Sequence, residues 1–275
     1  MRPLENFEGK FLRGSTRVLV AVCGILSIGW AISSLLVYRA EGTLATAAND
    51  VLQGEKFSQE QLSQLRHTLD ATPFSSIRPS VLRDVAIIRL RLVEESTAPS
   101  TADIDDFEKA LTAAVAGNPN SSLLWLMEYR LEGLRNGDSD RALKFLGMSY
   151  LSGPNEGWIA VRREPIALHD FARLPPELAQ LVVAEFSRLV QSGFYMVAAN
   201  IVAGPGWAIH ERLLGELAPV WEPVRRAFAK VLDSKDLDGA TVPGIDTRQL
   251  TRCDHWSNHG RDMSPAAPDA SSTCP

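Results

Sequence analysis

An uncharged run of twenty residues, from Val18 to Val37, constrains the fold of this chain more than any other feature. It reads VLVAVCGILSIGWAISSLLV, with Arg17 before it and Arg39 shortly after it. As a helix rising 1.5 Å per residue, the run is about 30 Å long, which matches the hydrocarbon core of a bilayer. The apolar region of a secretory signal is shorter, about 7–15 residues. The sequence therefore predicts a transmembrane helix over 18–38.

The basic residues around this run predict its orientation. Arg2, Lys10, Arg13 and Arg17 precede it, whereas Arg39 is the only basic residue in about the first fifteen that follow. Basic residues favour the cytoplasmic side of a membrane. We therefore expect a single-pass protein of the bacterial inner membrane, with residues 1–17 in the cytoplasm and the remainder in the periplasm.

Composition excludes several classes of protein. The 275 residues carry 28 basic and 33 acidic side chains, so the broad positive field of a dedicated nucleic-acid binder is absent and no nucleic-acid partner is expected. Three cysteines are too few for a disulfide-dense scaffold. The mean hydropathy of −0.05 is an average over one apolar segment and a polar remainder.

Residues 42–235 show helical periodicity and no run of strand-like alternation, which predicts an all-α domain. Ser58 and Gln61 form a capping box at the start of one helix. Pro79 begins another. The Pro175-Pro176-Glu177 string is typical of a third helix start, and Gly193 fits its end.

A repeat of helical hairpins is indicated between Asp105 and Arg163. Pro119 and Pro154 are 35 residues apart, and Trp125 and Trp158 are 33 apart. A period near 34 is that of the tetratricopeptide repeat, in which each hairpin needs neighbours to bury its apolar face.

Over about sixty residues the chain resembles the tetratricopeptide family. The chain departs from the family pattern at two places: Glu128 and Tyr129 stand where the family has its first-helix Leu-Gly pair, and Ser149 fills the third small position of the second helix. The resemblance implies a fold built from TPR-like αα-hairpins. The positions that match the family pattern are Phe107, Leu111, Ala114, Pro119, Trp125, Ala142, Leu146, Pro154 and Trp158.

A second resemblance concerns the strings SYLSGPNEGWIAVRREPIAL, at 149–168, and AGPGW, at 203–207. They are similar to segments of uncharacterised bacterial single-pass proteins from envelope polysaccharide gene neighbourhoods. That similarity implies a context of polysaccharide assembly or export and no particular reaction.

The composition of residues 236–275 predicts a disordered tail. Cys253, His255, His259 and Cys274 leave three alternatives open there: a metal site, a Cys253–Cys274 disulfide, or no structure. The acidic group Asp103, Asp105 and Asp106 is interpreted as the start of a helix. No metal and no cofactor are predicted.

The sequence contains no nucleophile elbow and no phosphate-binding loop. In TPR-like hairpins the first helices line a groove, which here predicts a partner-binding surface with Arg130, Trp158, Arg162 and Arg163. Arginines beside an aromatic ring can bind a carboxylate or an anionic polysaccharide. In the alternative interpretation, Trp158 fills the hairpin core and the arginines are solvated.

These features predict a non-enzymatic, membrane-anchored scaffold or adaptor that binds a protein partner in the cell envelope. One alternative is a chaperone-like adaptor of a secretion or cytochrome-maturation machine. Another is a glycan-acting enzyme that uses Glu156, Glu164 or Asp170 as acid and base, for which two carboxyl groups must face one pocket.

Overall fold

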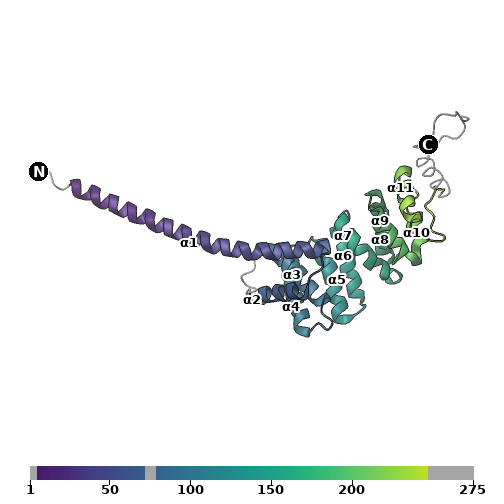
Figure 1. The fold of residues 1–275 in the computed structure, drawn as a ribbon, viewed down its shortest axis with the longest axis horizontal. Helices are drawn as coiled ribbons and strands as arrows, with labels where there is room; N and C mark the ends of the chain where they lie inside the picture. Colours follow the sequence, from purple (N-terminus) through teal and green to yellow (C-terminus); the bar gives the residue numbers. More distant parts are fainter. Residues whose placement is uncertain (1–4, 72–78, 247–275) are drawn as a thin grey trace, which may run out of the picture. The chain divides into compact units, whose positions relative to one another are not determined.

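The structure, a computed structural model, describes residues 5–71 and 79–246 (Figure 1). Every regular element in these two ranges is a helix, and no strand occurs in them. The all-α prediction is therefore confirmed for the described residues. The chain divides into two compact units, Met1–Pro119 (unit 1) and Asn120–Pro275 (unit 2), where a single helical domain over 42–235 was expected.

Unit 1 begins with α1, a single helix of 49 residues, Glu5–Gln53. It continues through residues 38–42, where the sequence predicted the end of one element and the start of the next. The C-terminal part of α1 packs on α3 (Pro79–Glu94) and buries Leu44, Ala47 and Ala48, while its N-terminal part extends away from α3 (Figure 1). No helix in the described ranges has both the length and the apolar character that a membrane span needs. The span predicted over 18–38 is therefore not supported by these residues.

Helix starts in unit 1 follow the caps that the sequence predicted. α2 (Gln59–Ala71) begins after Ser58, whose hydroxyl accepts a hydrogen bond from the Gln61 backbone N–H at 3.2 Å while the Gln61 amide oxygen accepts one from the Ser58 N–H at 2.8 Å. α3 begins at Pro79. Ser100 and Asp103 form the same reciprocal cap before α4 (Thr101–Gly117), which packs along α3. The acidic group at 103–106 thus opens a helix, as expected.

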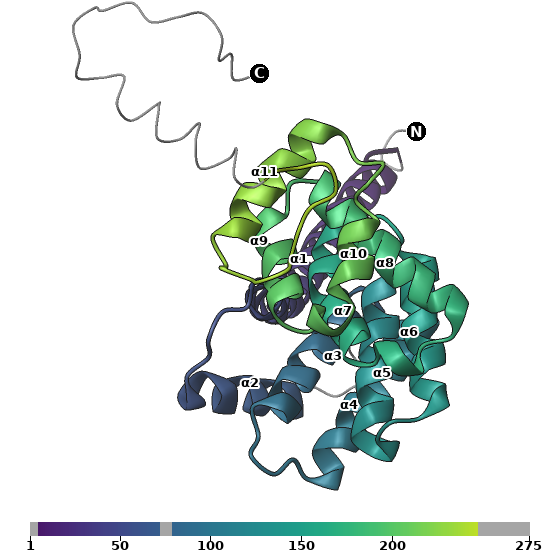
Figure 2. The ribbon, with the colours of Figure 1, turned by 90° about the vertical axis from the view of Figure 1, so that its right-hand side faces the viewer.

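Unit 2 consists of helices that pack on their sequence neighbours. α5 (Ser122–Asn136) and α6 (Asp140–Ser152) form a hairpin, and α7 (Gly157–His169) packs on α8. Figure 2 shows the last three α-helices gathered around α8. The remaining elements are α8 (Pro176–Gln191), α9 (Tyr195–Ala203), α10 (His210–Gly215), α11 (Glu222–Asp233) and the 3₁₀ turns Phe171–Arg173 and Trp207–Ile209.

The described part of unit 2 continues past Asp236, into the range 236–275 for which the sequence predicted a disordered tail. Leu237 and Ile245 pack against the core, and Val242 is only 3% exposed. These three apolar side chains are widely spaced in a polar segment, so composition alone did not distinguish them from a tail. Residues 247–275, with Cys253, His255, His259 and Cys274, lie outside the described residues.

The repeat-like spacing of the sequence corresponds to hairpins, but its two tryptophans are not equivalent. Ala142 and Leu146 of α6 are buried, as the pattern requires. Trp125 stacks on Phe145, with ring centroids 6.1 Å apart. Trp158, however, is 45% exposed, so the alternative that placed it in a hairpin core is wrong. A regular TPR-like repeat stays a prediction.

Candidate functional site

The four residues of the predicted groove divide into two sets. Arg130 is exposed on α5. On α7 the Arg162 guanidinium lies 5.8 Å from the centre of the exposed Trp158 ring, so these two side chains do meet at the surface. Arg163 is fully buried instead and cannot line an exposed groove. Successive helical residues are rotated by about 100°, which moves Arg163 from the outer face of Arg162 to the inner face shared with Ile159.

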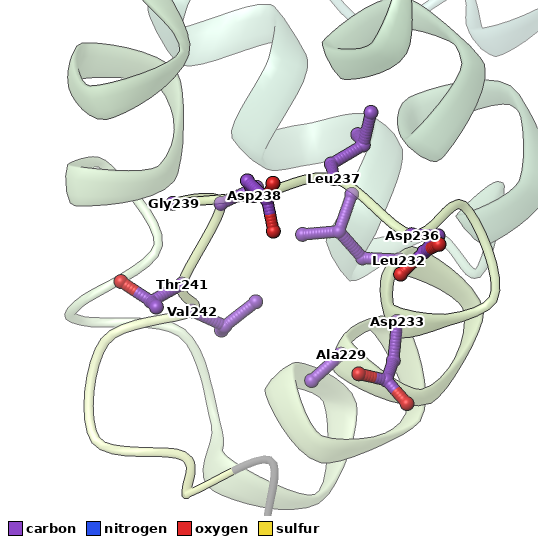
Figure 3. Close-up of a pocket in the computed structure, with 10 residues that line it drawn as sticks. Ala229, Leu232, Asp233, Asp236, Leu237, Asp238, Gly239, Thr241 and Val242 are labelled. Atoms are coloured by element: carbon purple, nitrogen blue, oxygen red, sulfur yellow. The ribbon is translucent and has the colours of Figure 1, made fainter.

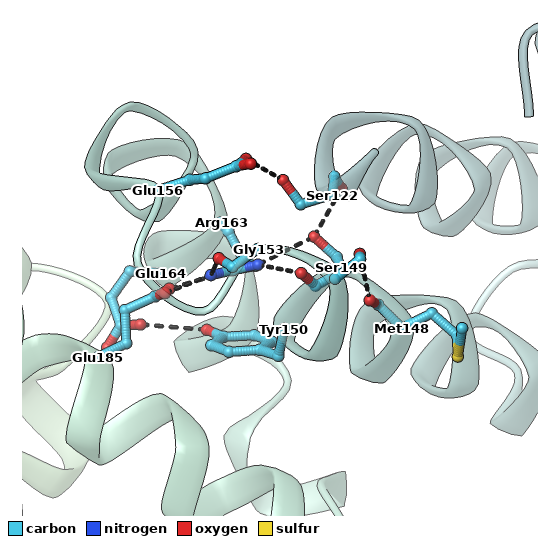
Figure 4. A network of polar contacts seen from close by, with 10 residues as sticks. Ser122, Met148, Ser149, Tyr150, Gly153, Glu156, Arg163, Glu164 and Glu185 are labelled. Atoms are coloured by element: carbon cyan, nitrogen blue, oxygen red, sulfur yellow. Dashed lines mark hydrogen bonds and ion pairs between the residues drawn. The ribbon is translucent and has the colours of Figure 1, made fainter. Parts of the chain in front are cut away.

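Arg163 is the centre of a buried polar network between α6, α7 and α8 (Figure 4). Its Nε donates to Glu185 Oε1 at 3.0 Å, and its Nη2 forms an ion pair with the other oxygen of Glu185. The Nη2 group also donates to the Gly153 carbonyl at 3.1 Å, while Nη1 donates to the carbonyl and the hydroxyl of Ser149. The network therefore satisfies both the charge and the donors of Arg163.

This network also caps α6. The last carbonyls of a helix have no partner within it and carry partial negative charge, which favours a cation at that end. The Ser149 carbonyl lies in the last turn of α6, where it also accepts from the Gly153 backbone N–H at 3.3 Å, and Gly153 directly follows the end of the helix at Ser152. Nearby, Ser149 donates to the Ser122 carbonyl at 2.8 Å, and Ser122 donates through its hydroxyl to Glu156. One buried cation thus fixes the C-terminus of α6 to α8.

A second carboxyl group adjoins the ion pair. The Tyr150 hydroxyl donates to Glu164 Oε2 at 3.1 Å, and the Arg163 guanidinium lies 3.9 Å from the Tyr150 ring centre. Within the described residues, Glu164 Oε1 is buried and has no hydrogen-bond partner. Burial, and then the charge of Glu185, raise the pKa of Glu164 well above its ordinary value. Both effects favour the neutral form of the Glu164 carboxyl group beside the charged pair.

The three carboxyl groups suggested as acid and base for a glycan-acting enzyme lie in separate places. Glu164 is enclosed in the network, and Glu156 accepts from Ser122. Asp170 is almost buried and accepts from the Tyr129 hydroxyl at 2.7 Å. Burial, and then this hydrogen bond, raise the pKa of Tyr129. None of the three carboxyl groups lines either of the two pockets described next.

One pocket lies between the start of α7 and the end of α8 and is called the α7–α8 pocket here. It has a volume of about 140 Å³. Glu185 links it to the buried network, because its carboxylate also binds Arg163. Arg188 and the 38% exposed Phe194 also line it. The full lining is Pro154, Asn155, Gly157, Ala160, Glu185, Arg188, Leu189, Gln191, Ser192 and Phe194.

Sequence reasoning missed this pocket, although one signal for it was present. Glu185 stands on the apolar face of α8, between Val182 and Leu189, where the helical period places core residues. A charged residue at such a position must find a buried partner. Nothing in the spacing identified Arg163, on another helix, as that partner.

The second pocket, of about 240 Å³, lies between the end of α11 and the segment that follows it (Figure 3). Asp233, Asp236 and Asp238 contribute carboxylates to its lining, and Leu232 and Val242 contribute apolar surface. Across residues 5–71 and 79–246, however, no three potential metal ligands are grouped so as to hold a metal ion.

Comparisons of the chain with protein-family models, with curated protein sequences and with solved structures give no match.

Proposed function

We propose that this chain is a non-enzymatic adaptor of the bacterial envelope, in which the apolar segment of α1 inserts into the inner membrane and the helical units bind a protein partner. In this proposal residues 1–17 are cytoplasmic and the units are periplasmic. The resemblance to proteins from envelope polysaccharide gene neighbourhoods suggests polysaccharide assembly or export as the context.

One observation carries the membrane part of the proposal. Between Leu19 and Leu35, nine large apolar side chains of α1 are exposed. An apolar surface of this size needs a lipid or protein environment, because exposing it to water is costly. The uncharged run at 18–37 and the basic residues before it favour lipid. The nine are Leu19, Val20, Val22, Ile25, Leu26, Ile28, Trp30, Ile32 and Leu35.

The adaptor part rests on the surface of unit 2. Trp158, with Arg162 above its ring, and Trp221, which is 73% exposed, are large side chains that gain most from burial against a partner. Tryptophan and arginine are enriched among the residues that dominate binding energy in protein interfaces. The buried network keeps α7 in a fixed place on α6 and α8, which presents Trp158 and Arg162 on a rigid support.

The membrane part is tested by extraction and by topology. We expect the full chain to remain in the membrane fraction after alkaline carbonate extraction. A periplasm-dependent phosphatase fused after residue 246 should be active, and the same reporter fused before residue 18 should not. Release by carbonate, or the opposite reporter pattern, would contradict the proposal.

The adaptor part is tested separately by crosslinking in cells. A photoreactive residue in place of Trp158 should capture one or a few discrete envelope proteins, and the same residue in place of Glu177, exposed on α8, should not. The identified partners decide between polysaccharide assembly and the secretion or cytochrome-maturation alternative. Capture of the same proteins from both positions would remove Trp158 from the binding surface.

A further inference from the structure

Arg188 stands out among the arginine side chains that the structure describes, because among these residues it has no hydrogen-bond or ion-pair partner. Most arginines of these units bind a carboxylate: Arg66, Arg83, Arg89, Arg91, Arg141, Arg163, Arg173 and Arg226. In the part of the chain that the structure describes, the half-buried Arg188 forms no hydrogen bond and no ion pair through its guanidinium. It lies in the last turn of α8, where the helix dipole favours a cation.

The surroundings of Arg188 form a small pocket that favours an anion. The other charged group in the α7–α8 pocket is Glu185, and Arg163 neutralises it from the core side. Arg188 is therefore the uncompensated charge of the pocket. This contrasts with the whole chain, whose formal net charge is −5.

The size and the rim of the pocket define what fits. A volume of about 140 Å³ is well below the 300–1,000 Å³ typical of sites for small-molecule ligands. It accommodates one side chain and not a whole metabolite. The exposed Phe194 ring lies against the start of α7, where a side-chain carbon at Gly157 would come 3.2 Å from it. This ring offers an apolar contact beside the charge.

We propose that the α7–α8 pocket binds an acidic side chain of the partner protein, with its carboxylate on Arg188 and an adjoining apolar residue on Phe194. The inference rests on the proposed adaptor function and deepens it by naming the chemistry of the partner segment. Arginine holds carboxylates well because its planar group donates two parallel hydrogen bonds. The rigid Arg163 network behind Glu185 keeps the floor of the pocket in place.

The test selects peptides from a random heptapeptide phage library on the full chain in lipid nanodiscs. We expect peptides enriched in aspartate or glutamate next to an apolar residue. Selection on Arg188→Ala should lose the acidic preference, and selection on Arg188→Glu should favour lysine and arginine. The matched control is Arg135→Ala, which removes an exposed arginine in the last turn of α5, outside the pocket, and should leave the preference unchanged.

Titration calorimetry then compares a selected peptide with its glutamine or asparagine counterpart. Loss of the carboxylate, or Arg188→Ala, should weaken binding by about tenfold or more, as expected for a charged hydrogen-bonded pair. Phe194→Ala should weaken both peptides equally. A library without acidic preference, no enrichment at all, or the same enrichment on Arg188→Ala would overturn the proposal.

These outcomes are distinct from failure of the adaptor function. If the photoreactive residue at position 158 captures discrete envelope proteins in cells with equal yield in the original chain and in the Arg188→Ala variant, the adaptor function stands and the pocket proposal fails. If the photoreactive residue at position 158 captures no partner in either chain, the adaptor function itself fails. Circular dichroism of each variant checks that the helices are retained.

Discussion

The N-terminal part of α1 and the centre of unit 2 both depart from the usual placement of side chains, in opposite directions. From Leu19 to Leu35, α1 leaves large apolar side chains exposed, whereas unit 2 buries the charged Arg163 and Glu185. The two departures carry different free-energy costs: one is the exposure of apolar surface to water, and the other is the burial of charge. The apolar surface of α1 needs an environment that the described chain does not provide, while the charges of unit 2 find their partners within the unit.

This difference separates a surface for binding from a device for fixing structure. Arg163 donates to three residues, Glu185, Ser149 and Gly153, and neutralises Glu185, so its hydrogen-bond donors and its charge are satisfied without a ligand. The exposed residues of α1 make no such set of contacts. We therefore expect α1 and the surface of unit 2 to bind other molecules, and the Arg163 network to hold the helices of unit 2 in place.

The largest expected effect is that of Arg163→Met. It leaves Glu185 as an uncompensated buried charge and removes the cap of α6, which typically costs about 3–5 kcal/mol of unfolding free energy. Urea unfolding followed by circular dichroism measures it. The double variant Arg163→Met/Glu185→Leu should recover most of the loss, because no buried charge remains. Arg162→Met is the control, with a change below about 0.5 kcal/mol. A double variant no more stable than the single one would show that capping, and not charge, dominates.

The second largest effect is expected in the exposed apolar stretch of α1. Leu26→Lys places a charge in the middle of the exposed apolar stretch of α1, which costs about 2.5–3.5 kcal/mol in a bilayer. We expect about a hundredfold weaker partition into lipid vesicles, measured by flotation. Leu134→Lys makes the same change on α5, where the leucine is 42% exposed, and should leave partition unchanged. Equal behaviour of the two variants would show that α1 does not bind lipid through this stretch.

The raised pKa of the Glu164 carboxyl group predicts a pH dependence of stability. Burial beside Glu185 raises the pKa of Glu164 in the folded state. As pH rises above the ordinary range of glutamate, the unfolded chain releases this proton and the folded chain keeps it. Stability should then fall by about 1.4 kcal/mol per pH unit until the folded group also ionises. Glu164→Gln should remove this slope in urea unfolding at successive pH values.

The control for that slope is Glu177→Gln, which changes an exposed carboxylate in the first turn of α8 and should retain it. The isosteric amide of Glu164→Gln can still accept the hydrogen bond from Tyr150. An unchanged slope in Glu164→Gln would assign the pH dependence to another group. A slope of the opposite sign would mean that Glu164 is ionised in the folded protein.

Local signals made much of the fold predictable. The capping box at Ser58, the proline at 79 and the Pro175-Pro176-Glu177 string each act within one turn, so the sequence around them contains the complete cause. The sequence did not predict that one helix continues through residues 38–42, because no local signal there shows whether a helix ends or continues. Leu44 and Ala48 reveal the continuation only through their packing in unit 1.

The site was less predictable because its causes lie on different helices. Arg162 and Arg163 are identical in type and adjacent in sequence, yet Arg162 is half-buried and Arg163 is completely buried. Which of them turns inward depends on the position of Glu185, 22 residues away. Arg188 could not be singled out from the sequence either. Arg163 is distinguished by a partner on another helix, whereas Arg188 is distinguished by the lack of a partner among the described residues.

The smallest expected effect is that of breaking the Arg66–Asp103 ion pair, which is partly exposed, whereas the Arg163–Glu185 pair is buried. In unit 1, Asp103 binds Arg66 and accepts from Ser100 in the cap of α4, and these bonds lower the pKa of Asp103. Its contribution is therefore present above the ordinary aspartate range and is lost as pH falls. Because the pair is partly solvated, Asp103→Ala should cost about 1 kcal/mol or less.

A double-mutant cycle with Arg66→Ala separates the two contributions of Asp103. The ion-pair part should vanish in about 1 M NaCl, where screening acts over roughly 3 Å, whereas the hydrogen bonds of the cap should persist. The same salt should leave the loss caused by Arg163→Met unchanged, because no solvent reaches that pair. If salt weakened both pairs equally, the two units would not differ in the way that burial implies, and the rigid support proposed for Trp158 would lose its basis.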